Sequence, residues 1–385
     1  MVVEPDRVTA NAEPDHAAQD ESDPALTVPH QRNGAQHGSA EPVAAPAVPA
    51  KPAHRPWPSA RQQIGTGVAV LGWGMALFLV GHRFLPDSAG LVSLVESSLP
   101  WLAIPTALLL LAALAARSPR AVIAAVAATA LWGGNYGPQL LPRGADLPPD
   151  LRVLSEDVNA STAELAAAGS LAAAQHADIL ALQDVYPRLA GSPAITALND
   201  SYGYHVTQYE FGLWSRYPVT GTRAVGLATS TSQTAGGEPL VADAPHVVVG
   251  ALRVTVATPR GDLVVYLVHL PPPVLGGQGF AKVRNAAVDR LAALIAADPA
   301  PRLAVVGSLN VAATDRRFTE LTRHLGLTSA QASAGRGFGF TWPAAFPAVR
   351  LDDLLARGAT PVRCVVLPAL AGGKAHLPIE IDLHL

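Results

Sequence analysis

Three long apolar runs in the first 141 residues limit what this chain can fold into. They cover residues 64–80, 99–116 and 121–136, and the last can be extended to residue 141. Each approaches the roughly 20 residues that a helix needs to cross a bilayer, although a buried core helix has a similar composition. Aromatic residues typical of membrane interfaces lie among them, namely Trp73, Trp101, Trp132 and Tyr136. A mean hydropathy of +0.25 also favours membrane spans.

Basic residues flank these runs unevenly. They gather before the first run and in the second loop, as Lys51, Arg55, Arg61, Arg117 and Arg120. By the positive-inside rule, these segments face the cytoplasm, so with three spans everything after residue 141 is exoplasmic. Two or four spans would reverse the side. Because the chain is poor in Lys and rich in Ala, Pro and Gly, we expect a multi-pass protein of a bacterial cell membrane.

Composition divides the chain into four parts. Residues 1–60 lack a sustained apolar period and predict a disordered cytoplasmic tail. Residues 61–141 form a membrane region with about three transmembrane helices, and residues 142–150 form a Pro-rich linker. Residues 151–385 alternate short apolar runs with helical stretches, which predicts an α/β domain. The net charge of -3 argues against nucleic acid as a partner.

Polar side chains recur at the predicted strand ends of this domain. The apolar run at residues 303–306 predicts a strand buried on both faces, which delivers Ser308 and Asn310 to its carboxyl end. Other predicted strands end at Glu156 and Asp157, at Asp184, at His269, and at Asp352 and Asp353. Each residue alone has a structural explanation, such as a turn, a helix cap or a hydrogen-bonded buried histidine. Because ligands bind at the carboxyl ends of strands in open α/β folds, together they predict a shared pocket.

The order of these motifs resembles the endonuclease/exonuclease/phosphatase superfamily over residues 151–385, and more narrowly its bacterial branch with membrane helices before the domain. The matching segments are LRVLSEDV, ADILALQDV, GLWSRYPV, VHLPPP, GSLN, TWPA, RLDDLL and KAHLP. The resemblance implies two mixed β-sheets packed face to face and flanked by helices. It also implies hydrolysis of phosphoesters with a divalent metal, usually Mg²⁺.

The resemblance carries functional roles onto particular residues. It places metal ligands at Asp157 and Asp184 and catalytic residues at His269, Asn310, Asp352 and His376. In such a site the Asp352 carboxylate orients the His376 imidazole.

Several positions depart from the family pattern. Ser308 replaces the water-activating Asp of the GDxN motif, and a hydroxyl is far too weakly basic for that role. Ala375 replaces the Asp of the SDH motif and has no ligand atom. Asp184 replaces a Glu and reaches less far toward a metal, whereas Asp157 replaces an Asn and adds a carboxylate. Lys374 is either a phosphate contact or a solvated loop lysine.

We therefore expect a membrane-anchored member of this family with impaired catalysis. One alternative is an active phosphodiesterase or phosphatase that uses Mg²⁺ or Mn²⁺ on a small or lipid-linked phosphoester. Another is a binding module without hydrolysis, which holds a phosphorylated ligand or a protein partner and needs no metal.

Overall fold

The computed structural model describes residues 57–86, 90–185, 189, 191–229, 247–273, 281–370, 373 and 376–385. The described residues all belong to one compact unit, Trp57–Leu385. Nearly all of the tail predicted for residues 1–60 therefore lies outside the described residues.

Helices make up the first part of the described chain. They are α1 (Ala60–Gly81), α2 (Leu91–Ser97), α3 (Ala103–Ala116) and α4 (Pro119–Tyr136), with 3-10 turns at His82–Phe84, Leu99–Leu102 and Gly137–Leu140. Helix α1 begins with a capping box, in which Ser59 and Gln62 bond each other's backbone N–H groups. By length and composition, the stretches Ala60–Phe84 and Leu99–Ala116 qualify as candidate membrane spans. Helix α4 does not, since Arg120 and Asn135 make it more polar.

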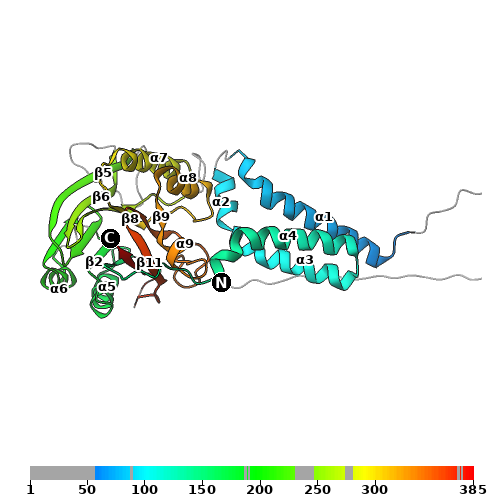
Figure 1. The fold of residues 1–385 in the computed structure, drawn as a ribbon, viewed down its shortest axis with the longest axis horizontal. Helices are drawn as coiled ribbons and strands as arrows, with labels where there is room; N and C mark the ends of the chain where they lie inside the picture. Colours follow the sequence, from blue (N-terminus) through cyan, green and yellow to red (C-terminus); the bar gives the residue numbers. More distant parts are fainter. Residues whose placement is uncertain are drawn as a thin grey trace, which may run out of the picture. The chain divides into compact units, whose positions relative to one another are not determined.

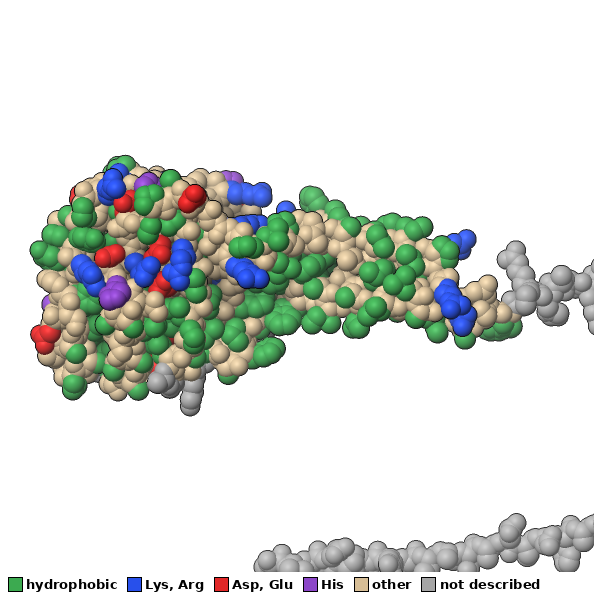
Figure 2. All heavy atoms as spheres, turned by 60° about the horizontal axis from the view of Figure 1, so that its bottom comes forward, with side chains coloured by type: hydrophobic (Ala, Val, Ile, Leu, Met, Phe, Trp, Pro, Cys, Tyr) green, Lys and Arg blue, Asp and Glu red, His purple; other side chains and the backbone are tan. Residues whose placement is uncertain are grey.

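Small residues let these helices approach closely. A Cβ on Gly72 of α1 would lie 3.0 Å from Ala124 of α4, and one on Gly65 would lie 2.7 Å from Ser118. Large apolar side chains point outward instead, and Leu77 and Leu108 are 73% and 59% exposed. On the face drawn in Figure 2, hydrophobic side chains cover the helices, while charged side chains gather on the α/β domain and at the helix ends.

Two mixed sheets form the α/β domain (Figure 1). The first has the strand order β11-β12-β1-β2-β4-β3, with β1 (Leu151–Asp157), β2 (Ile179–Gln183), β3 (Tyr204–Gln208), β4 (Phe211–Ser215), β11 (Thr360–Val366) and β12 (Ile379–His384). The second has the order β5-β6-β7-β8-β10-β9, with β5 (Val219–Thr229), β6 (Val247–Thr258), β7 (Gly261–His269), β8 (Leu303–Ser308), β9 (Thr328–Ser329) and β10 (Asp352–Arg357). Strands β1 and β2 pair in parallel, as do β7 and β8.

Alternating side chains bury both faces of each sheet. In β7, Leu263, Val265 and Leu267 pack between the two sheets, whereas Val264 and Tyr266 pack on the outer face. That outer face is covered by α7 (Lys282–Ala297) and α8 (Arg316–Leu325). The outer face of the first sheet is covered by α5 (Thr162–Ala174) and α6 (Pro193–Ser201), and α9 (Ala330–Ala334) lies by β9.

The predicted fold of two mixed sheets flanked by helices is confirmed. One detail of the sequence interpretation is wrong. Asp352 and Asp353 begin β10 rather than follow a strand. Because β10 runs antiparallel to β8, its first residue still pairs with Ser308 at the carboxyl end of β8.

Candidate active site

Residues predicted to share a pocket meet at one end of the space between the two sheets. Strand β1 ends at Asp157, and Asp184 follows β2, its parallel neighbour. In the second sheet, strand pairing sets His269 beside Ser308, and Ser308 beside Asp352. The register of both sheets therefore brings these side chains together.

Ser308, Asp352 and His376 form a chain of hydrogen bonds. The Ser308 hydroxyl donates to Asp352 Oδ1 at 2.6 Å, and His376 Nδ1 lies 2.7 Å from Asp352 Oδ2. Burial opposes ionisation of both partners, but their mutual attraction prevails, so the pKa of Asp352 is lowered and the pKa of His376 is raised. The predicted Asp352–His376 contact is present, and both oxygens of Asp352 are engaged.

Asp157 faces the same serine from the other sheet. Its Oδ2 lies 3.3 Å from Ser308 Oγ, and its Oδ1 accepts a hydrogen bond from the backbone N–H of Asn159 at 3.0 Å. A carboxylate on β1 thus lies directly across from the hydroxyl on β8.

His269 lies among three carboxylates. Its ring nitrogens are 3.6 Å from Asp157, 4.0 Å from Asp184 and 3.6 Å from Glu210. Burial alone would lower the pKa of His269, but the contact with Glu210 and the negative charges around the ring outweigh burial and raise the pKa to about 10. Without another cation at the site, the imidazole is therefore protonated at neutral pH.

Glu210 is a site residue that the sequence interpretation missed. It lies between β3 and β4, immediately before Phe211 begins β4. Strand β4 pairs antiparallel with β2, so its first residue lies beside the end of β2, close to Asp184. The hairpin pairing is the signal that would have identified Glu210, and no local motif marks it.

The cluster fits a divalent cation. Asp184, Glu210 and His269 each offer one ligand atom, and these atoms lie within 4.8 Å of one another. Two carboxylates and an imidazole suit a first-row transition ion better than Mg²⁺, which prefers oxygen ligands alone. Of the two predicted metal ligands, Asp184 belongs to this cluster, and Asp157 approaches it through His269.

Asn310 is held in an unusual backbone conformation beside the cluster. Its φ is +50°, in the left-handed region, and its Nδ2 donates to the Leu270 carbonyl at 2.7 Å. Arg284, at the start of α7, donates to the Asn310 carbonyl at 3.4 Å. The predicted neighbourhood of His269 and Asn310 is therefore present.

Two carboxylates from the predicted strand ends have other roles. Asp353 points away from the cluster and accepts hydrogen bonds from Ser329 and the Leu354 N–H. Glu156 is buried, its carboxylate accepts no hydrogen bond from the described residues, and burial raises its pKa well above the usual range. Lys374 and Ala375 lie outside the described residues.

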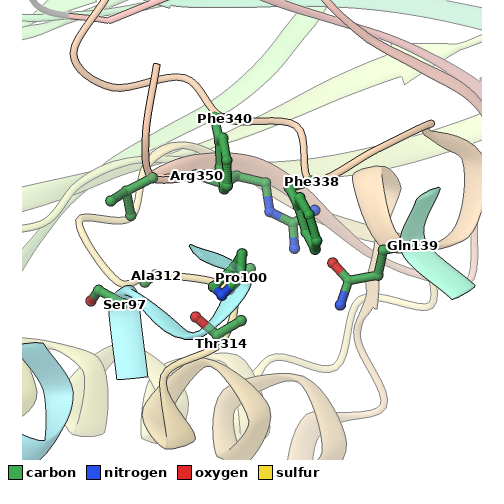
Figure 3. Close-up of a pocket in the computed structure, with 10 residues that line it drawn as sticks. Ser97, Pro100, Gln139, Ala312, Thr314, Phe338, Phe340 and Arg350 are labelled. Atoms are coloured by element: carbon green, nitrogen blue, oxygen red, sulfur yellow. The ribbon is translucent and has the colours of Figure 1, made fainter. Parts of the chain in front are cut away.

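A small pocket is lined in part by residues that lie close in sequence to Asn310 and Asp352 (Figure 3). Ala312 follows Asn310 by two positions, and Arg350 precedes Asp352 by two. Arg350 is 6% exposed, and its Nε makes no hydrogen bond within the part of the chain that the structure describes. Residues from the helical part also line this pocket, namely Ser97, Pro100 and Gln139.

The candidate site thus consists of carboxylates, histidines and an asparagine gathered at one end of two packed mixed sheets. The family model of the endonuclease/exonuclease/phosphatase family matches residues 132–374. The chain belongs to this family. The search of curated proteins gave no match.

Solved structures of similar proteins include members of the same family. One is the family protein of Beutenbergia cavernae DSM 12333, with 17% identity, a TM-score of 0.45 and coverage of 62% of this chain and 72% of that chain. Another is from Bacteroides vulgatus, with 15% identity, a TM-score of 0.46 and coverage of 62% and 100%. A third is sphingomyelinase C from Streptomyces griseocarneus, with 16% identity, a TM-score of 0.44 and coverage of 61% and 99%.

Proposed function

We propose that this protein is a membrane-anchored member of the family that binds a divalent cation and a phosphorylated ligand but hydrolyses phosphoesters only slowly. The observation that carries the proposal is Ser308, which stands where the family has the Asp that activates water. Its hydroxyl donates to Asp352 and has no basicity to accept a proton from water at neutral pH. Losing a positioned general base costs about 10² to 10⁴ in rate.

Neighbouring groups do not replace that base on the same side of the site. Asp352 already accepts hydrogen bonds on both oxygens, from Ser308 and His376. Pairing with Asp352 raises the pKa of His376, which favours the imidazole as a hydrogen-bond donor or acid over a role as a base. Binding of phosphate is therefore better supported than its hydrolysis.

Cation binding is supported by the Asp184, Glu210 and His269 cluster. When bound, a divalent ion supplies positive charge that stabilises the developing negative charge of a phosphoester. His269 must release its proton to become a ligand, so cation binding weakens as the pH falls. The imidazole in the donor set favours Mn²⁺ over Mg²⁺.

Phosphate binding is supported by side chains with N–H groups near the cluster. The His376 imidazole, which contacts Asp352, and the Asn310 amide, which donates one hydrogen bond to the Leu270 carbonyl, both lie at this end of the sheets. We also propose Lys374 as a phosphate contact, and the support for it is its position in the sequence two residues before His376. The ligand class is a phosphorylated small molecule or a lipid-linked phosphate, and nucleic acid is disfavoured by the net charge of -3.

A second candidate function, an active hydrolase, is favoured by one distance. Asp157 Oδ2 lies 3.3 Å from Ser308 Oγ, so the carboxylate lost from β8 has a counterpart on β1. In that case Asp157, which replaces a family Asn, accepts the proton of the attacking water in place of the Asp that Ser308 replaces.

Membrane anchoring through three spans is supported by the number of times that the chain must cross the membrane. Residues 93 and 96, in the loop between the first two apolar runs, contact the α/β domain at residues 315 and 316. Residues 98 and 151 therefore lie on the same side of a membrane, and the chain between them crosses it an even number of times. If α3 spans, then α4 spans as well, despite its lower hydropathy.

Sidedness follows from the positions of the basic residues. Arg61, Arg117 and Arg120 are exposed at the other end of the helices, where α1 begins and α3 meets α4. The positive-inside rule puts that end in the cytoplasm and the α/β domain outside. The proposed organisation is thus a cytoplasmic tail over residues 1–60, a membrane region over 61–141, a linker over 142–150 and an exoplasmic domain over 151–385.

Turnover by the full chain tests the proposal. The purified protein in lipid nanodiscs is assayed with Mn²⁺ or Mg²⁺ on bis-p-nitrophenyl phosphate and on p-nitrophenyl phosphate, beside a His376→Ala control. We expect a rate no more than about tenfold above that control, because no positioned base is present. A rate at least a thousandfold above the control would support the active hydrolase instead.

A further inference from the structure

The short helix α2, in the loop between the first two apolar runs, contributes side chains to the support of the candidate site. We infer that Ser93 and Glu96 are positioning residues, which fix the segment after Asn310, so that the site in the α/β domain is incomplete without the loop. This inference rests on the proposed function for the meaning of the site, but the contacts are independent of it.

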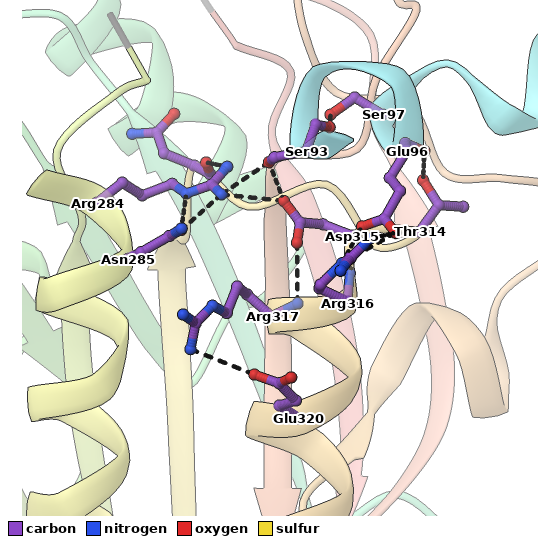
Figure 4. Close-up of polar contacts among 11 residues, drawn as sticks. Ser93, Glu96, Ser97, Arg284, Asn285, Thr314, Asp315, Arg316, Arg317 and Glu320 are labelled. Atoms are coloured by element: carbon purple, nitrogen blue, oxygen red, sulfur yellow. Dashed lines mark hydrogen bonds and ion pairs between the residues drawn. The ribbon is translucent and has the colours of Figure 1, made fainter. Parts of the chain in front are cut away.

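Ser93 completes a buried cluster of charges (Figure 4). Its hydroxyl accepts a hydrogen bond from Arg284 at 2.8 Å and donates one to Asp315. Arg284 also forms an ion pair of 3.0 Å with Asp315. All three residues are at least 98% buried, so water does not reach the cluster to replace the serine.

Arg284 passes this constraint to the candidate site. One of its nitrogens, Nη1, donates to the backbone carbonyl of Asn310, while Nη2 bonds Ser93 and Asp315. A non-glycine residue with φ +50° keeps that conformation only when its surroundings hold it there. The Arg284 hydrogen bond is one of the contacts that do so, and Ser93 limits where the guanidinium can lie.

Glu96 fixes the other end of the same segment. Its carboxylate accepts hydrogen bonds from the Arg316 backbone N–H at 2.9 Å and from Arg316 Nη2 at 2.9 Å. Its backbone carbonyl accepts a bond from the Thr314 hydroxyl at 2.6 Å. Arg316 also donates to the carbonyls of Leu85 and His82, just after α1. The loop thereby holds this segment directly at Thr314–Arg316 and, through Arg284, at Asn310.

The extent of these contacts distinguishes them from a surface association. Glu96 is 0% exposed and Ser93 is 1% exposed. Exposed ion pairs contribute little to the stability of a fold, whereas removing the partner of a buried charge strongly destabilises it. A loop that only tethered the domain would not need the fully buried carboxylate of Glu96, which bonds Arg316 at the start of α8.

Amide hydrogen exchange of the full chain in nanodiscs tests the inference, with Ser93→Ala compared with Ser98→Ala. Ser98 is a matched control, because it caps the same helix, is exposed, and its hydroxyl bonds the Val95 carbonyl of that helix. We expect residues 309–316 to exchange about tenfold faster in Ser93→Ala, and to remain within about twofold of wild type in Ser98→Ala. Equal exchange in the two variants would overturn the inference.

Binding of inorganic phosphate with Mn²⁺, measured by calorimetry, separates positioning from a purely structural contact. We expect binding about tenfold weaker in Ser93→Ala and unchanged in Ser98→Ala. Faster exchange with unchanged phosphate affinity would overturn the positioning role. If wild type itself bound no phosphate, the proposed function would fail, and the exchange comparison would decide the inference by itself.

A second pair of variants repeats the test where Ser93→Ala does not fold. Glu96→Gln removes the charge that holds Arg316, and Glu320→Gln is its control, because Glu320 forms an exposed ion pair with Arg317. Faster exchange of residues 309–316 in Glu96→Gln alone is expected. The same exchange in both variants would contradict the inference.

Discussion

Gly307 is the residue whose replacement should disturb the candidate site most directly, because it lies in β8 immediately before Ser308. Its backbone φ is +130°, a value that residues with a side chain rarely adopt. An added Cβ would lie 2.2 Å from the Val268 carbonyl oxygen in the paired strand. The same Cβ would lie 3.1 Å from the Gln183 side chain of the opposite sheet. Neither a backbone carbonyl in a sheet nor a buried side chain can move away freely.

Gly307→Ala should therefore lower the free energy of unfolding by a sum of two terms. Holding Ala at this φ costs about 1–3 kcal/mol. Forcing a methyl group into the packed space between the sheets costs about 1–3 kcal/mol more. The expected loss is about 2–6 kcal/mol, which lowers the melting temperature of a domain of this size by roughly 4–24 °C.

Urea unfolding of the full chain in detergent, followed by tryptophan fluorescence, measures this loss. Gly203→Ala is the control, because no atom lies within 4 Å of an added Cβ there. It should change stability by less than about 0.5 kcal/mol. A loss below about 1 kcal/mol in Gly307→Ala would refute the reasoning, since it would mean that β8 and Val268 can separate at little cost.

Other variants test the electrostatics of the site. The folded-state pKa of Glu156 is raised above its ordinary value near 4.5, so stability falls as the pH rises above that value, and Glu156→Gln should stabilise metal-free protein by roughly 1–3 kcal/mol at pH 8 and by less at pH 4. Thermal melts at both pH values check this, and equal effects would contradict it. The folded-state pKa of His376 is raised, so its pairing with Asp352 stabilises the fold below about pH 6.5 and is lost as the pH rises through the raised pKa. Asp352→Asn should accordingly cost about 3 kcal/mol at pH 6 and less at pH 10, and a cost that grew with pH would show the wrong sign. Glu210→Gln should weaken Mn²⁺ binding by about tenfold or more in a calorimetric titration, and an unchanged affinity would place the cation elsewhere.

Much of the α/β domain could be predicted from sequence, because its strands are short apolar runs that end in polar residues. The run before Ser308 is buried on both faces, as expected for a central strand. Asp157, Asp184 and His269 meet because β1, β2, β7 and β8 all end at the same edge. The start of β10 at Asp352 could not be predicted in this way, because apolar residues both precede and follow Asp352 and Asp353 in the sequence.

Contacts between distant segments could not be predicted from local pattern. Glu210 joins the site because β4 pairs with β2, and that pairing leaves no trace in the residues around Glu210. Ser93 and Glu96 belong to no motif in the sequence, although both are buried against segments about 190 to 220 positions away in the chain. A single sequence gives the composition of each element, whereas these contacts depend on how the elements pack.

Restoring the family pattern tests the central claim most directly. In the double variant Asp157→Asn with Ser308→Asp, the carboxylate returns to β8 and an amide returns to β1. At saturating Mn²⁺ in nanodiscs, we expect phosphodiester turnover to rise at least about 10²-fold over wild type, and to be lost again on adding His376→Ala. Fast turnover by wild type that fell in the double variant would contradict the claim, because it would identify Asp157 as the working base.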